Sequence, residues 1–124
     1  MPGKKKILVV DDDPDILAVT SLVLKPEGYE VSTAGSGAEA RERLRAGLPD
    51  LVVLDIMMEE PDSGFKLAQE FGPSVPIIVL SSIAEASSQV FDTSSLTVAA
   101  MIDKPIRPDH LLATVRRLLK EAPP

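Results

Sequence analysis

The sequence contains no cysteine, so it has neither a disulfide framework nor a thiolate that binds a metal or acts as a nucleophile. Positive charge is also scarce, because 13 Lys and Arg stand against 19 Asp and Glu, a formal net charge of −6. Binding to the nucleic acid backbone requires clustered Lys and Arg. We therefore expect that this chain does not bind nucleic acid directly.

Long hydrophobic runs are missing as well. Acidic residues interrupt the first apolar run, Ile7–Val10, directly after Val10, which leaves it too short for a signal peptide or a membrane span. The length of 124 residues suits one domain. The 44% of hydrophobic residues argues against a disordered chain. The composition therefore predicts a soluble, cytoplasmic, single-domain protein without membrane association.

Short apolar runs of strand length, each at least partly β-branched, recur along the chain. They are Ile7–Val10, Leu51–Leu54, Ile77–Leu80 and Val98–Ile102. Because they lack the polar alternation of a half-exposed strand, they predict parallel strands buried on both faces of a sheet. A fifth segment, Tyr29–Thr33, alternates more and is predicted to be an edge strand.

Helical patterns separate these runs. The first predicted helix ends at Pro26, and Ser36–Glu39 predicts a capping box at the start of the second. Gly64–Phe71 predicts a short third helix, and Pro108 begins a last helix with a clear apolar stripe. Ala84–Thr97 should contain the remaining crossover helix, but it is rich in serine and has little apolar periodicity.

Strand and helix thus alternate five times, which predicts an α/β fold with a parallel sheet and right-handed crossovers. In such sheets, ligands bind beyond the carboxyl ends of the strands. Polar residues follow the predicted buried strands directly. They are Asp11, Asp12 and Asp13, then Asp55, then Ser81 and Ser82, and finally Asp103 and Lys104.

The chemistry of this set is that of phosphoryl transfer. Several carboxylates in one pocket repel one another unless one is protonated or a cation joins them. A donor set of oxygen atoms alone favours Mg²⁺ over Zn²⁺. A carboxylate can itself act as the nucleophile and form an aspartyl phosphate, while Lys104 and the Ser81 hydroxyl hold the other phosphoryl oxygens. The set predicts metal-assisted phosphoryl transfer onto an aspartate.

Four motifs in this chain resemble, in order and spacing, those of the receiver domain of two-component response regulators. They are Val9–Pro14, Leu54–Met58, Ile77–Ser81 and Lys104-Pro105. The resemblance extends over about residues 5–120, so we expect residues 1–124 to form a single receiver domain. It implies a flavodoxin-like (βα)5 fold, in which a doubly wound five-stranded parallel sheet has the order 2-1-3-4-5.

The resemblance also implies roles for individual residues. Asp55 would take a phosphoryl group from the phosphohistidine of a sensor histidine kinase or phosphotransfer protein, in a Mg²⁺-dependent reaction. Asp12 and Asp55 would bind the metal directly, Asp11 largely through a water, and Met57 through its backbone carbonyl. Lys104 would pair with the phosphoryl group. The protein would catalyse its own phosphorylation and slow dephosphorylation without being a turnover enzyme.

The signal is expected to pass by conformational change to a downstream protein or an output domain, and homodimerisation stays open. Two features depart from the family pattern on this signalling side. Met101 occupies the position of an aromatic switch residue, and Ala84–Ser95 has an atypical sequence for the fourth helix. We expect Ala84–Ser95 to be mobile without phosphate, because it buries few apolar side chains.

Other departures lie beside the phosphoacceptor. The segment Met58–Gly64 is longer and more acidic than the family pattern. Met57 and Ile83, two positions past Asp55 and Ser81, are apolar and cannot orient an attacking water. The sequence therefore predicts that the phosphorylated form lasts many minutes or longer. The Lys104–Pro105 bond resembles the family's cis peptide, which is plausible because its second residue is proline.

Structural interpretations compete with these roles. Asp11–Asp13 also suit a helix cap, Asp13 and Asp15 are predicted to be capping or surface acids, and His110 is predicted to be a surface residue. Three other functions are open. One is a pseudo-receiver, a protein-binding module that acts without phosphorylation. Another is a phosphohydrolase that resembles haloacid dehalogenases, with Asp11 as nucleophile. The third is a flavodoxin-like cofactor binder, whose phosphate a triple-aspartate loop would repel.

Overall fold

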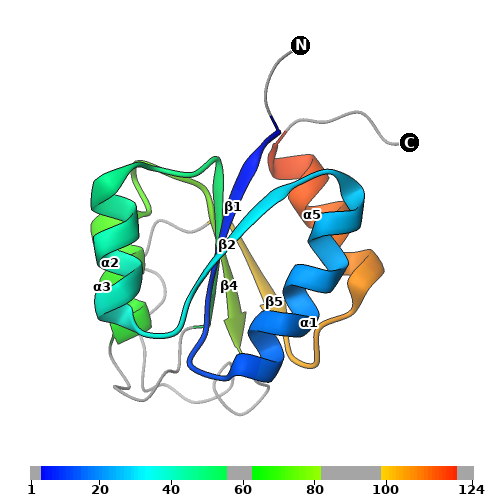
Figure 1. Cartoon of the computed structure of the whole chain (residues 1–124), viewed down its shortest axis with the longest axis horizontal. Helices are drawn as coiled ribbons and strands as arrows, with labels where there is room; N and C mark the ends of the chain where they lie inside the picture. The colour runs from blue at the N-terminus through cyan, green and yellow to red at the C-terminus, as the bar shows by residue number, and fades with distance from the viewer. Residues whose placement is uncertain (1–3, 56–62, 82–98, 120–124) are drawn as a thin grey trace.

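A computed structural model describes residues 4–55, 63–81 and 99–119 of the chain (Figure 1). Strands and helices alternate along it. The elements are β1 (Lys6–Val10), α1 (Pro14–Leu24), a 3₁₀ turn η1 (Lys25–Glu27), β2 (Glu30–Ala34), α2 (Gly37–Ala46), β3 (Leu51–Asp55), α3 (Ser63–Phe71), β4 (Ile77–Ser81), β5 (Ala100–Asp103) and α5 (Pro108–Leu118). None of these helices has the length and apolar character needed to cross a membrane.

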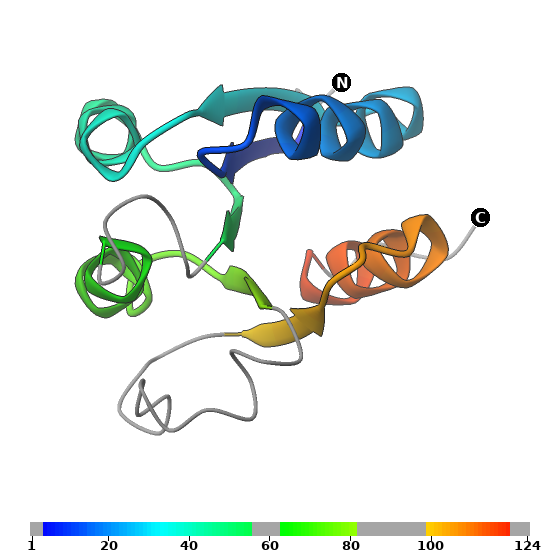
Figure 2. The same ribbon diagram turned by 90° about the horizontal axis from the view of Figure 1, so that it is seen from below.

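The strands form one five-stranded sheet in the order β2-β1-β3-β4-β5, and each neighbouring pair is parallel. Helices cover both faces of this sheet, with α1 and α5 on one side and α2 and α3 on the other (Figure 2). This is the doubly wound α/β fold with the predicted strand order. From β1 the chain adds β2 on one side of the sheet, and from β3 it adds β4 and β5 on the other. The boundary between β1 and β3 is therefore the switch point in strand order, beyond which ligands of open parallel sheets bind.

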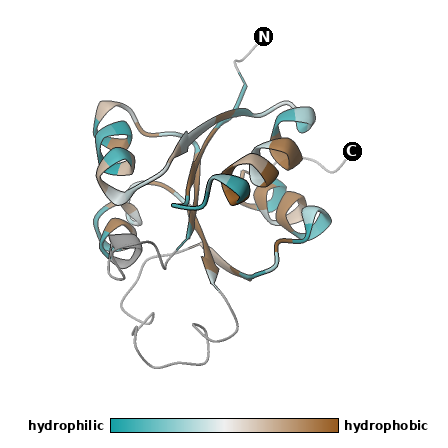
Figure 3. Ribbon diagram, turned by 60° about the horizontal axis from the view of Figure 1, so that its bottom comes forward, coloured by the Kyte–Doolittle hydropathy of each residue, from teal (hydrophilic) through white to brown (hydrophobic). Residues whose placement is uncertain are grey.

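The core consists of two apolar layers separated by the sheet. Because side chains alternate along a strand, Ile7 and Val9 pack in the layer with α1 and α5, whereas Leu8 and Val10 pack in the layer with α2 and α3. Every residue of β3 and β4 is buried. The strands at the centre of the sheet are brown in Figure 3, the colour of hydrophobic residues, while the helices carry both brown and teal segments. Burial of each large side chain stabilises the fold by about 1.5–3 kcal/mol.

Local signals start the helices where the sequence predicts them. The Ser36 hydroxyl accepts a hydrogen bond from the Glu39 backbone N–H at 3.1 Å and caps α2. The Glu39 carboxylate accepts the N–H of Gly35, at 2.6 Å, one residue before the position that a capping box predicts. Pro108 is the first residue of α5. Gly28, with a left-handed φ of 94°, ends η1.

The prediction for the last strand is wrong in one respect. Val98–Ile102 is predicted to be buried on both faces, but β5 begins at Ala100 and only Ile102 is buried within it. Met101 is 44% exposed. The reason is the strand order, which places β5 at the edge of the sheet, with β4 as its neighbour. The edge position predicted for Tyr29–Thr33 is confirmed, because β2 ends the sheet on the other side.

Candidate functional site

The polar residues predicted from the sequence gather at the carboxyl ends of neighbouring strands. Val10 pairs with Leu54 across β1 and β3, so the residue after each, Asp11 and Asp55, reaches the same edge. Ser81 ends β4, where it pairs with Asp103 of β5, and Lys104 follows directly. The parallel register therefore assembles groups from four strands that are far apart in the sequence.

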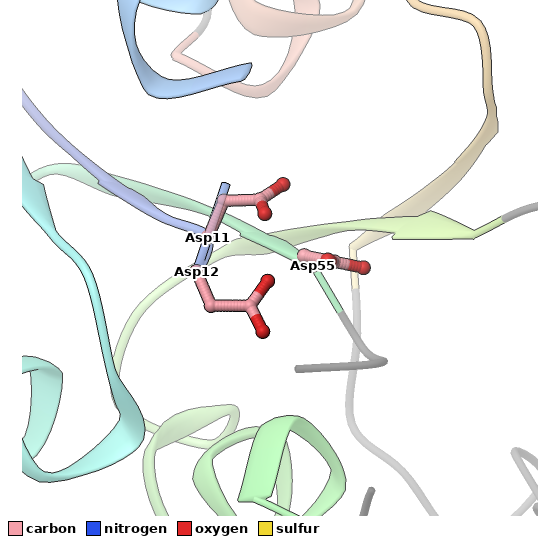
Figure 4. Close-up of side chains that lie close together, drawn as sticks. All are labelled: Asp11, Asp12 and Asp55. Carbon is pink, nitrogen blue, oxygen red and sulfur yellow. The ribbon is translucent and has the colours of Figure 1, made fainter. Parts of the chain in front are cut away.

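Three carboxylates form the centre of this site. Asp11, Asp12 and Asp55 each place a carboxylate oxygen within 4.8 Å of the other two, and Figure 4 shows the side chains at the ends of the adjacent strands β1 and β3. Asp11 and Asp55 are buried, whereas Asp12 is exposed. Among the described residues, no other cluster of three or more such side chains has this geometry.

The local backbone orients Asp11. Its Oδ1 accepts the backbone N–H of Asp13 at 3.0 Å, and its own N–H donates to the Ala34 carbonyl of β2 at 3.1 Å. Asp13 has a different function, because its side chain accepts the N–H of Asp15 at 2.9 Å and caps α1. Capping and metal-ligand geometry thus coexist in the same acidic run, with the roles divided between successive residues.

Lys104 supplies the positive charge of the site. Its Nζ lies 3.2 Å from Asp55 Oδ2 and 3.8 Å from Asp11 Oδ2. The Lys104 N–H donates to the Ser81 carbonyl at 2.8 Å, which fixes the backbone beside β4. The Lys104–Pro105 peptide is cis, as the resemblance to receiver domains implies. The contact with Asp11 was not predicted, because the sequence carries no sign of how far the lysine reaches across the sheet.

The electrostatics of the site disfavour an additional negative charge. The pKa of Asp11 is raised from 3.8 to about 6, chiefly by burial and also by the negative charge of Asp55, against the opposing effects of the Asp13 N–H and Lys104. One lysine therefore does not fully compensate the carboxylates. A divalent cation would complete the compensation.

Two buried oxygen atoms of the site lack hydrogen-bond partners in the described part of the chain, Asp11 Oδ2 and Ser81 Oγ. Buried polar atoms of proteins are nearly always hydrogen-bonded, so these two indicate where a ligand completes the site. A carboxylate oxygen suits a hard cation such as Mg²⁺. A hydroxyl suits an oxyanion, since it can donate a hydrogen bond. The residues present therefore fit a magnesium ion together with a phosphoryl group.

The structure does not bring every predicted polar residue into this group. Asp103 and His110 are exposed, and the surface position predicted for His110 is confirmed. Met57, Ser82, Ile83 and the segment 84–95 lie outside the described residues, as do residues 58–62 of the acidic loop. The predictions for these positions therefore stay predictions.

Comparison with known proteins points to one family. The model of the response regulator receiver domain matches residues 7–116. The chain is 39% identical over 123 residues to the probable transcriptional regulator ycf27 of Porphyra purpurea, covering 96% of this chain and 49% of that protein. It is 34% identical over 120 residues to the DNA-binding response regulator MtrA of Mycolicibacterium smegmatis, covering 94% of this chain and 51% of that protein. The chain thus spans about half the length of the curated relatives it matches.

Solved structures agree with this match. The receiver domain of NtrX from Brucella abortus superposes with a TM-score of 0.81 at 30% identity, covering 94% of this chain and 99% of that one. The chemotaxis protein CheY4 of Vibrio cholerae superposes with a TM-score of 0.80 at 27% identity, covering 94% and 99%.

Proposed function

The chain belongs to the family of response regulator receiver domains, and from that premise we propose that Asp55 accepts a phosphoryl group from a phosphohistidine of a sensor histidine kinase or phosphotransfer protein. The observation that carries this proposal is the position of Lys104 Nζ, 3.2 Å from Asp55 Oδ2, beside a cluster of three carboxylates. This arrangement combines a nucleophile with a cation for the developing negative charge.

In the proposed transfer, a carboxylate oxygen of Asp55 attacks the phosphorus atom. The new P–O bond forms as the P–N bond to the histidine breaks, and the electron pair of that bond returns to the imidazole nitrogen, which takes up a proton. Lys104 neutralises one phosphoryl oxygen, and the Ser81 hydroxyl, which has no partner within the described residues, donates a hydrogen bond to another. Such positioned charges stabilise the loose transition state of phosphoryl transfer.

The proposed metal ligands are Asp12 and Asp55 directly, Asp11 largely through a water, and the backbone carbonyl of Met57. When bound, Mg²⁺ supplies the positive charge that screens the carboxylates from the incoming phosphoryl oxygens. The carboxylates hold that cation without thiolate or imidazole groups, which matches the preference of Mg²⁺ for oxygen.

Intact-mass measurement after incubation with acetyl phosphate tests the proposal. The wild-type protein should gain the mass of one phosphoryl group with Mg²⁺ and not without it, and Asp55→Asn should gain none. Asp50→Asn is the matched control, because Asp50 precedes the same strand at its opposite end. This variant should react like the wild type.

The same experiment separates the competing functions. No metal-dependent mass gain in the wild type, with no spectral response to beryllofluoride and Mg²⁺, would favour a pseudo-receiver. Phosphate retained on Asp11 instead of Asp55 would favour the phosphohydrolase chemistry.

We also propose that the phosphorylated domain signals by conformational change to a downstream protein or to an output domain. Support comes from two relatives, one named as a probable transcriptional regulator (ycf27) and one as a DNA-binding response regulator (MtrA). Both are about twice as long as the match, since the chain covers 49% of ycf27 and 51% of MtrA. On this proposal the chain is a signalling module in which Asp55 is modified, and it does not turn over a substrate.

A further inference from the structure

Helix α1 presents an apolar face to solvent, away from the core. Thr20 and Leu24 on its inner side are buried, whereas Val19 is 49% exposed and Leu22 is 72% exposed. Ala18, one turn before Leu22, is exposed as well. At 100° per residue these three side chains lie on one side of the helix, opposite the buried stripe. We call Ala18, Val19 and Leu22 the outer face of α1.

Opposite charges lie at the two ends of the outer face. Asp15 stands in the first turn of α1, and Lys25 follows its last residue as the C-cap. Both are exposed, and within the described residues neither forms an ion pair. With a rise of about 1.5 Å per residue, the two charges are separated by about 15 Å along the helix.

This pattern is self-complementary under a twofold axis. If two copies of α1 lie antiparallel through their outer faces, with the axis at the level of Thr20 along the helix, Asp15 of each copy faces Lys25 of the other. The same symmetry places Ala18 opposite the partner's Leu22, so that a small side chain meets a large one at both ends of the contact. An isologous dimer requires this kind of reciprocal pairing, in which residue i contacts j and j contacts i.

We propose that the outer face of α1 binds a second copy of this chain, as an antiparallel helix pair. The surface beside it supports the fit, because a shallow hollow of about 450 Å³ between α1 and β2 is lined by Ala18, Leu22 and Thr33. This hollow leaves room for the partner's Leu22 next to Ala18. The inference does not depend on phosphorylation of Asp55, since none of its residues belongs to the carboxylate cluster.

The predicted dimer is weak. One helix pair covers less than the roughly 800 Å² per partner of a standard interface, and exposed ion pairs contribute little each. We therefore expect monomers at about 10 µM and substantial dimer at about 1 mM. Sedimentation velocity over this range measures the equilibrium, and amide chemical shifts that move with concentration should map to α1.

Charge reversal provides the decisive variants. Asp15→Lys places two like-charged pairs in the dimer, and Lys25→Asp does the same with the opposite sign, so each should weaken self-association about tenfold. When the two variants are mixed, the lysines of one face the aspartates of the other at both ends. The mixture should therefore form a heterodimer with an affinity near that of the wild type.

Recovery in the mixture excludes misfolding as the cause of the loss, and thermal melts of each variant provide a further check. Leu22→Ser should weaken association without changing the charge pattern. A wild-type protein that stays monomeric at about 1 mM would overturn the proposal. Two other results would also overturn it: self-association that neither charge reversal weakens, or a mixture of the two variants that does not regain the wild-type affinity. The outer face would then be available to a different protein.

Discussion

The two ends of β3 each carry an aspartate, Asp50 before the strand and Asp55 at its last position. Asp50 is exposed, and its Oδ2 accepts the Lys6 backbone N–H at 2.7 Å while its own N–H donates to the Lys6 carbonyl at 2.8 Å. Asp55 is buried, with an exposed fraction of 2%, and it shares its surroundings with Asp11 and Asp12.

The difference between these aspartates shows how position in a parallel sheet determines the role of a carboxylate. At the amino end, Asp50 completes backbone hydrogen bonding between β1 and β3 while it stays in contact with water. At the carboxyl end, parallel strands bring further acids to the same edge, and burial leaves an oxygen of Asp11 without a hydrogen-bond partner in the described residues. The end for which we propose the chemistry is the one where the negative charge is incompletely compensated.

Magnesium affinity should separate the two ends most strongly. Asp55→Asn removes one negative charge from the proposed metal-binding cluster, so we expect at least about a tenfold loss of Mg²⁺ affinity. Asp50→Asn should change the affinity by less than about twofold, because its charge is exposed and screened. A titration followed by amide chemical shifts measures both. Equal losses in the two variants would contradict this assignment of the site.

Lysine removal should have the next largest effect. Lys104→Met leaves Asp55 and Asp11 without their shared cation, so we expect the free energy of unfolding of the metal-free protein at neutral pH to fall by about 1–3 kcal/mol. Lys6→Met is the matched control at the amino end. Its Nζ lies 4.0 Å from the exposed Glu30 carboxylate, so its loss should cost less than about 0.5 kcal/mol. Urea denaturation compares the variants, and similar costs would show that Lys104 does not compensate the buried acids.

The smallest of the three effects is expected at Asp11, whose pKa is raised from 3.8 to about 6 by burial and then by Asp55. Because the folded chain holds this proton more tightly than the unfolded chain, ionisation between about pH 4 and 6 lowers the free energy of unfolding. Asp11→Asn removes that cost and should stabilise the metal-free protein by about 1–2 kcal/mol at pH 7.

The pH dependence is the check on this last prediction. The difference in unfolding free energy between Asp11→Asn and the wild type should grow as the pH rises from 4 to 7. A constant difference at Asp11 would mean that its carboxyl titrates normally in the folded chain.

Much of the fold was predictable because it depends on local patterns. Three apolar runs identified β1, β3 and β4, since strands buried on both faces need apolar side chains at every position. Ser36 and Pro108 marked helix starts because their preferences act within one turn. Met101 shows the limit, since its exposure follows from the place of β5 at the edge, and one strand's sequence does not state which strands lie beside it.

The candidate site was predictable in its members but not in its contacts. Asp11, Asp12, Asp55, Ser81 and Lys104 could be named because each lies one or two positions past the end of a predicted strand, and parallel strands end at one edge. The environment of each residue could not be predicted in this way, because the contrast between exposed Asp12 and buried Asp11 depends on packing against residues distant in the sequence. The exposed Val19 and Leu22 of α1 gave no functional signal either, since helical spacing alone does not say which apolar residues face the core.

The sequence by itself determined the alternation of strands and helices, the acidic character and the kinds of chemical group available at the strand ends, because these depend on composition and on short-range periodicity. Only the tertiary structure decided that Lys104 lies close to both Asp55 and Asp11, that burial raises the pKa of Asp11, and that α1 presents an apolar face to solvent. These properties arise from distances and solvent exclusion between segments far apart in the chain, and both quantities come into existence only when the sheet and its two helical layers pack.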